Sequence, residues 1–140
     1  MLPQPFRSPA IYRPLRGRLY VATLYAEGNR EWLIALGIRP GDFDRETKTW
    51  RIARKHLQGL LKAMLVRWGR PVHVYADFNT KERCATSCQK AKGDECTCSC
   101  MGRRHAGGRY LEGWRKVGPY VLVRDEIARQ EWIVDPRISP

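Results

Sequence analysis

Residues 55–78 read KHLQGLLKAMLVRWGRPVHVYADF. In the first part, apolar residues recur every three or four positions, which predicts an amphipathic helix that ends at Gly69. After Pro71 the pattern changes to strict alternation, which predicts a strand with Val72, Val74 and Phe78 on one side. We therefore expect a helix that packs on a sheet. Its buried stripe consists of Leu57, Leu60, Leu61, Met64, Leu65 and Trp68.

Three shorter segments precede this pair. RLYVATLYA (18–26) is apolar on both sides, which indicates a central strand. REWLIALGI (30–38) has helical spacing, and TWRIA (49–53) indicates another strand. The sequence therefore predicts an α+β protein whose body, residues 18–82, is a small βαβαβ unit of sheet covered by helices. Trp32, Trp50 and Trp68 are expected in its core.

Two different patterns flank the body. Residues 1–17 contain four prolines and several arginines, which predicts an extended, basic, proline-rich arm that is either a flexible tail or a nucleic-acid contact. Residues 110–140 contain two strand patterns, GPYVLVRDE (118–126) and ARQEWIVDP (128–136). We expect them to form a C-terminal β-hairpin that packs on the body, with Val121, Val123, Trp132 and Val134 available to pair.

Residues 83–109 have no apolar periodicity but hold a dense set of metal-binding side chains. All five cysteines and one of the three histidines fall within the motif C-x3-C-x7-C-x-C-x-C-x4-H. Zinc takes four tetrahedral nitrogen or sulfur ligands, commonly from two local pairs. We therefore expect this segment to be a zinc-stapled loop. The candidate ligands are Cys84, Cys88, Cys96, Cys98, Cys100 and His105.

Six candidates exceed the four ligands of one zinc ion. On a regular strand, Cys96, Cys98 and Cys100 would extend over about 13 Å, because the rise is about 3.3 Å per residue. We favour Cys84, Cys88 and His105 with one or two of these three. A second metal, an iron–sulfur cluster and a set of redox thiols remain alternatives. No catalytic zinc motif is present, so we expect a structural metal and assign no catalytic residue.

The charge balance is strongly basic. Lys and Arg number 26 against 14 Asp and Glu, which gives a formal net charge of +12 and favours polyanionic partners such as nucleic acid. Apolar runs are too short and too often charged for a membrane-spanning segment, and no signal-peptide pattern opens the chain. We therefore expect a cytoplasmic protein, where thiols stay reduced and bind metals.

Part of the body resembles a known DNA-contacting module. Residues 18–66 resemble the HARP-type module of annealing helicases, in which a strand and helix precede a D-x-x-x-K-x-W turn; Asp44, Lys48 and Trp50 match that turn. The resemblance implies DNA contact at branched or forked structures. It implicates Arg45, Lys48, Arg51, Arg54 and Lys55, and basic residues of the metal loop add Arg103, Arg104 and Arg109.

The cysteine segment carries a second resemblance. Cys84 to His105 resembles a Cys/His motif of uncharacterised actinobacterial and phage proteins, which implies no activity. That motif usually ends in G-x-x-H-G, so the sequence around His105 departs from it. The leading hypothesis is a nucleic-acid-binding protein, with DNA favoured, in which zinc orders a basic loop. The alternatives are a protein-interaction module that docks on a host complex, and a metal-dependent nuclease.

Overall fold

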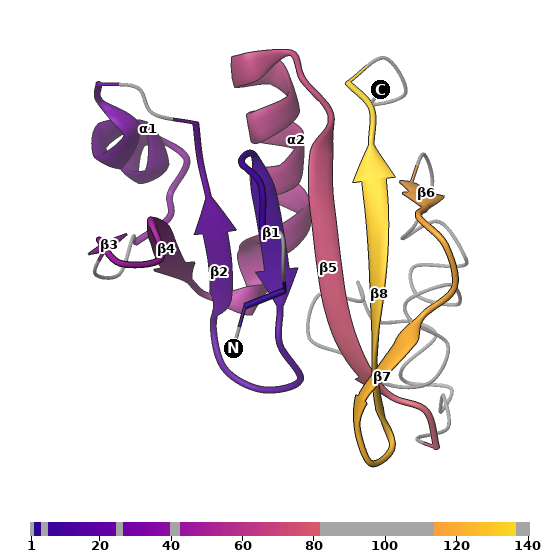
Figure 1. Cartoon of the computed structure of the whole chain (residues 1–140). Coiled ribbons are helices and arrows are strands. Elements are labelled where there is room, and N and C mark those ends of the chain that lie inside the picture. Colours follow the sequence, from indigo (N-terminus) through magenta and orange to yellow (C-terminus); the bar gives the residue numbers. More distant parts are fainter. Residues whose placement is uncertain (1, 4–5, 25–26, 40–42, 82–113, 137–140) are drawn as a thin grey trace.

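The computed structural model describes residues 2–3, 6–24, 27–39, 43–81 and 114–136. Within them the fold is α+β, with two helices and one sheet of eight strands (Figure 1). No described helix is long and apolar enough to cross a membrane. The strands are β1 (Ala10–Arg13), β2 (Leu19–Ala22), β3 (Phe43–Asp44), β4 (Thr49–Ile52), β5 (Val72–Asn79), β6 (Trp114–Lys116), β7 (Val121–Arg124) and β8 (Ile127–Val134). The helices are α1 (Asn29–Ala35) and α2 (Leu57–Trp68), and a 3-10 turn, η1 (Arg54–His56), leads into α2.

The sheet is larger than the predicted βαβαβ unit. Its order is β3-β4-β2-β1-β5-β8-β6, and β7 also pairs with β8. β1 and β5 are parallel, while the other described pairs are antiparallel. The predicted strands and helices of the body are present, but β4 and β5 are not neighbours. The predicted strand β2 and the unpredicted strand β1 lie between them.

The amino-terminal segment differs from the prediction. Residues 1–17 were expected to lie outside the sheet because of their prolines, yet β1 is a fully buried central strand. Pro9 and Pro14 flank β1 instead of interrupting it, so no proline removes a hydrogen-bond donor from the ladder. β1 is buried on both faces and only four residues long, so its sequence shows no alternation that could reveal it.

The face of the sheet that α2 covers forms the main core, as predicted. Leu57, Leu60, Leu61, Met64 and Leu65 of α2 are buried against it, and Trp68 packs at the margin. The strand residues opposite them include Val72, Val74, Ala76 and Phe78. α2 ends at Gly69, whose φ of 60° suits a residue without a side chain.

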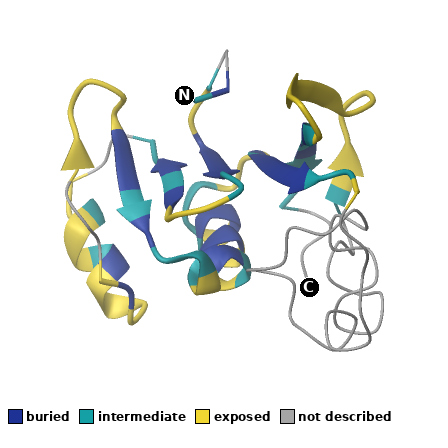
Figure 2. Ribbon diagram, turned by 90° about the horizontal axis from the view of Figure 1, so that it is seen from below, coloured by how far each residue is buried: buried dark blue, intermediate teal, exposed yellow. Residues whose placement is uncertain are grey.

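The opposite face, which no described helix covers, carries a smaller apolar cluster. Ala10, Tyr12, Ala22 and Tyr75 form it. Leu2 and Phe6 pack on this cluster, so the start of the chain lies on the side of the sheet away from α2 (Figure 2). We call this surface the helix-free face.

The predicted C-terminal hairpin is present as β7 and β8, but its register differs. Val121 pairs with Arg129, whereas Trp132 and Val134 pair with Lys116 and Trp114 of β6. Along the edge of β8 that faces away from β5, the pairing segment is divided into β6 and β7 by residues 117–120, which include Pro119. The buried Gln130 side chain fixes this break by donating to the carbonyl of Gly118 at 3.0 Å.

The α2 stripe yields a stability prediction. Leu61 is 1% exposed, whereas Val66 on the same helix is 84% exposed. Changing Leu61 to Ala should lower the free energy of unfolding by about 2–5 kcal/mol, because it leaves a cavity in the core. The control Val66→Ala should change it by less than about 0.5 kcal/mol. Urea unfolding measures both, and equal effects would contradict the assigned packing.

Candidate nucleic-acid interface

The D-x-x-x-K-x-W segment forms the β3–β4 hairpin. One carboxylate oxygen of Asp44, Oδ1, accepts hydrogen bonds from the backbone amides of Glu46 at 2.9 Å and Thr47 at 3.3 Å. Lys48 closes the turn with a φ of 57°, and Trp50 is buried. Asp44 and Trp50 therefore shape the hairpin, which leaves the exposed side chains of Arg45 and Lys48 at its tip.

A pocket of about 680 Å³ lies between this hairpin, the end of β2 and the start of α1. Its apolar lining comes from Leu24, Phe43 and Trp50. Phe43 packs on Trp50 with a ring-centroid distance of 4.9 Å and still exposes 42% of its surface. The charged residues in the described lining are Arg30, Arg45, Lys48 and Glu31, so cations outnumber carboxylates among them.

The wall of the pocket formed by α1 is fixed to the rest of the protein. The Asn29 side chain donates to the carbonyl of Leu24 at 3.0 Å and accepts from the Arg67 guanidinium at 3.2 Å. That guanidinium lies over the rings of Trp32 and Trp68, at 4.9 and 5.3 Å from their centroids. Arg67 thus joins α1 to α2, and this contact holds Arg30 beside the pocket.

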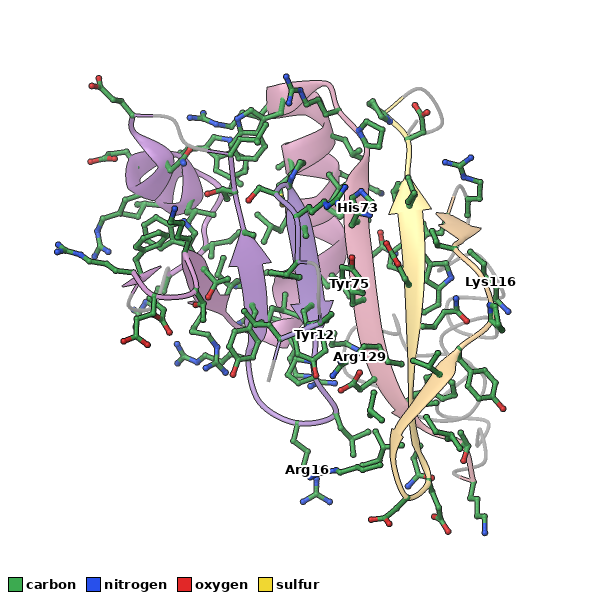
Figure 3. All side chains as sticks on the ribbon, in the orientation of Figure 1. Tyr12, Arg16, His73, Tyr75, Lys116 and Arg129 are labelled. Carbon is green, nitrogen blue, oxygen red and sulfur yellow. The ribbon has the colours of Figure 1, made fainter. Side chains whose placement is uncertain are left out.

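A second basic group lies at the other end of β4. Arg51 near the end of β4 and Arg54 just after it donate to carbonyls of the β1–β2 loop, and Lys55 follows them. The loop contributes the exposed Arg16 and Arg18. Figure 3 shows Arg16 pointing away from the sheet at the lower end of this loop. At about 3.3 Å per residue, the four residues of β4 separate the two basic groups by roughly 10 Å.

Two predicted nucleic-acid contacts are already used inside the protein. Arg54 donates to the carbonyls of Pro14 at 2.6 Å and Gly17 at 3.2 Å, so it holds the β1–β2 loop. Arg51 stacks on the ring of Tyr20 at 3.8 Å from its centroid. Lys55, by contrast, is exposed. The other predicted contacts, Arg103, Arg104 and Arg109, lie outside the described residues.

The candidate zinc ligands also lie outside the described residues. They are Cys84, Cys88, Cys96, Cys98, Cys100 and His105. In the part of the chain that is described, no group of three or more His, Cys, Asp or Glu side chains is placed to hold a metal ion.

Sequence reasoning missed several residues of this surface. Arg16 was assigned to an extended arm and Arg18 to the first strand of the body, and Arg30 and Phe43 were not assigned a role. The sequence signal for Phe43 is its position as the one aromatic residue in the otherwise polar turn DFDRETKT. Nothing in the sequence alone indicates that Arg30 and Phe43 lie beside the same pocket, because α1 and β3 are separate segments.

The helix-free face holds a buried polar network that the sequence did not reveal. The Tyr12 hydroxyl donates to Asp77, and the Arg129 guanidinium donates to Asp77 at 2.7 Å and to the Tyr12 oxygen at 2.8 Å. Figure 3 shows Tyr12 and Arg129 side by side across the middle of the sheet. Burial lowers the pKa of the Arg129 guanidinium, but the hydrogen bond and charge of Asp77 outweigh this effect and raise it.

A second polar group continues along the same face. His73 Nδ1 lies 2.9 Å from a Glu131 carboxylate oxygen, and both side chains are more than a quarter exposed. Burial, followed by the charge of Glu131, raises the pKa of Tyr75 to about 12. Alternation in HVYADF places His73, Tyr75 and Asp77 on one side of β5, and this is the signal that sequence reasoning left unused.

Comparison with known proteins adds no relative. No protein-family model, no curated protein and no solved structure matches the chain.

The raised pKa of Tyr75 predicts a loss of stability at high pH. The ordinary pKa is 10.0, so the folded state keeps the phenol proton at a pH where the unfolded state loses it. The contribution of the Tyr75 phenol proton to the free energy of unfolding is complete below pH 10 and is lost as the pH rises from about 10 to about 12. Urea unfolding at pH 9 and 11 should show a smaller decline for Tyr75→Phe than for the wild type. Equal declines would show that Tyr75 titrates normally.

Proposed function

We propose that this protein binds nucleic acid, with DNA favoured, through exposed cations at the two ends of β4. The observation that carries the proposal is the convergence of separate segments. The β1–β2 loop, the start of α1, the β3–β4 hairpin and η1 place six exposed cations at the two ends of β4: Arg16, Arg18, Arg30, Arg45, Lys48 and Lys55. The ion pairs between described residues include none of these six side chains.

Phosphate contact is the chemistry that this surface supports. Arginine presents several N–H donors in a planar fork that matches a phosphate group, and lysine adds a mobile point charge. The net charge of +12 attracts a polyanion before contact is made. Binding of this kind releases counterions from the nucleic acid, so its affinity falls steeply as the salt concentration rises.

The proposal keeps zinc as a structural cofactor of residues 83–109. The cysteine-rich ligand set is typical of a closed site that contributes folding free energy. Arg103, Arg104 and Arg109 lie within or next to this segment and would extend the basic surface once the metal orders it. The metal takes no part in a reaction in this proposal.

Elemental analysis tests the metal directly. We expect about one zinc per chain in protein purified without chelators. Removing it should reduce the ordered content of residues 83–109 while the sheet persists, because the α2 core does not depend on those ligands. Protein that is metal-free when purified without chelators, yet cooperatively folded throughout, residues 83–109 included, would rule the zinc site out.

Charge neutralisation tests nucleic-acid binding. Arg45→Gln with Lys48→Gln, and separately Arg16→Gln with Arg18→Gln, should weaken binding to all sequences about equally. Each lost phosphate contact should lower the slope of log affinity against log salt by about 0.9 for duplex DNA and about 0.7 for single strands. Fluorescence anisotropy with labelled DNA and RNA, from about 50 mM salt upward, measures both quantities.

The matched control removes the same amount of charge elsewhere. Lys62 on α2 and Arg70 after it are exposed, and neither adjoins β4. The double variant Lys62→Gln with Arg70→Gln should leave the slope nearly unchanged. If it weakens binding as much as the β4 variants do, the site is not localised. If the wild type binds no nucleic acid at about 50 mM salt, the proposal fails, since basic binders are strongest at low ionic strength.

A protein-interaction module is the second candidate, and one observation favours it. Tyr120, Val121, Leu122 and Val123 are 40–63% exposed around β7, a large apolar surface for one short strand. Such patches often mark protein contacts. In that case Leu122→Asp would abolish capture of a protein partner, while the charge variants would leave the capture intact. The nuclease alternative has no described catalytic group to support it.

A further inference from the structure

We propose that the pocket beside the β3–β4 hairpin holds one unstacked base of a single-stranded segment, with the neighbouring phosphates on Arg30, Arg45 and Lys48. This inference rests on the proposed nucleic-acid binding and makes it specific. It predicts that the protein prefers single-stranded nucleic acid and that Phe43 contacts the base directly. Duplex DNA cannot place a base in the pocket, because its bases are stacked and paired.

The shape and lining of the pocket fit such a ligand. Its volume of about 680 Å³ lies within the usual range of small-molecule sites. Phe43 offers a free ring surface, since 42% of it is exposed even though it packs on Trp50. Every base has a flat aromatic face, so an exposed aromatic ring can stack on a base whatever its sequence.

The charges around the pocket match a base that is attached to its backbone. Arg30, Arg45 and Lys48 are all exposed and border the apolar lining, so phosphates can reach them while the base is inside. Glu31 is the one carboxylate among the lining residues that the structure describes. A carboxylate repels phosphate but accepts hydrogen bonds from an exocyclic amino group of a base. An apolar pocket that bound phosphate alone would make no use of Leu24, Phe43 or Trp50.

Contacts within the protein hold both walls of the pocket in place. Asp44 fixes the turn through two backbone amides, and Trp50 anchors it in the core. The opposite wall is held through Asn29 and Arg67. A pocket with both walls fixed before binding loses little conformational entropy when the ligand enters.

The inference is tested by removing the aromatic ring of the protein and the bases of the probe, separately and together. The probes are a single-stranded DNA oligonucleotide, the same length of strand in which every base is replaced by an abasic spacer, and the matching duplex. Phe43→Ala should weaken binding to the normal strand roughly 5- to 150-fold, the range expected for loss of one base–aromatic stack. It should leave the salt slope unchanged, since no phosphate contact is lost. It should have no effect on the abasic strand or on the duplex.

Phe43→Leu provides the folding control, because it keeps an apolar side chain on Trp50 but removes the flat ring. It should melt like the wild type and lose the same affinity as Phe43→Ala. Two results would overturn the inference while nucleic-acid binding stands: unchanged binding of the normal strand by both variants, or an equal loss with the abasic strand. A mononucleotide that binds as tightly as the oligonucleotide would also overturn it, in favour of a free-nucleotide site. If the wild type binds no strand at about 50 mM salt, the proposed function fails as well.

Discussion

The parallel pairing of β1 with β5 is the contact on which the rest of the fold depends. It is the one link in the described sheet between β3-β4-β2 on one side and β8, β6 and β7 on the other. Ile11 and Val74, which face each other across it, are both fully buried. α2 lies behind this join and covers it with leucine and methionine side chains. The helix therefore buries the junction of two half-sheets. Without this junction, the edges of β1 and β5 would be exposed to water.

The basic surface shows how one residue type serves two purposes. Arg54 and Arg67 lie between segments, and they join the β1–β2 loop to η1 and α1 to α2. Arg45, Lys48 and Arg16 lie where those segments reach solvent. The structural arginines thus set the positions of loops whose exposed cations are available for phosphate. A count of positive charges cannot separate the two groups, whereas the hydrogen bonds of each guanidinium do.

The sequence predicted elements with a strong period and missed those without one. The run from Leu57 to Phe78 contains a helical period followed by a strand period, so its helix, strand and buried face were all predicted. β1 is buried at all four positions and lies between two prolines, so it shows no alternation, and β6 has only three residues. Arg45 and Lys48 were found through the hairpin motif. Arg30, Phe43 and the Tyr12–Asp77–Arg129 network depend on contacts between distant segments, which local patterns do not encode.

That network has a consequence for how the chain is made. Tyr12 and Arg129 are 117 positions apart and share one carboxylate. On the ribosome, β1 emerges together with its antiparallel partner β2, but long before β5 and β8, which carry the other two members of the network, have been synthesised. Until then the edge of β1 that pairs with β5 is open, and the Tyr12 hydroxyl has neither Asp77 nor Arg129 as a partner. The described sheet can be completed only after β8 has been synthesised, and loop closure over such distances is slow. β8 is the last of the described strands to emerge, and its Arg129 completes the network that ties it to Tyr12 of β1.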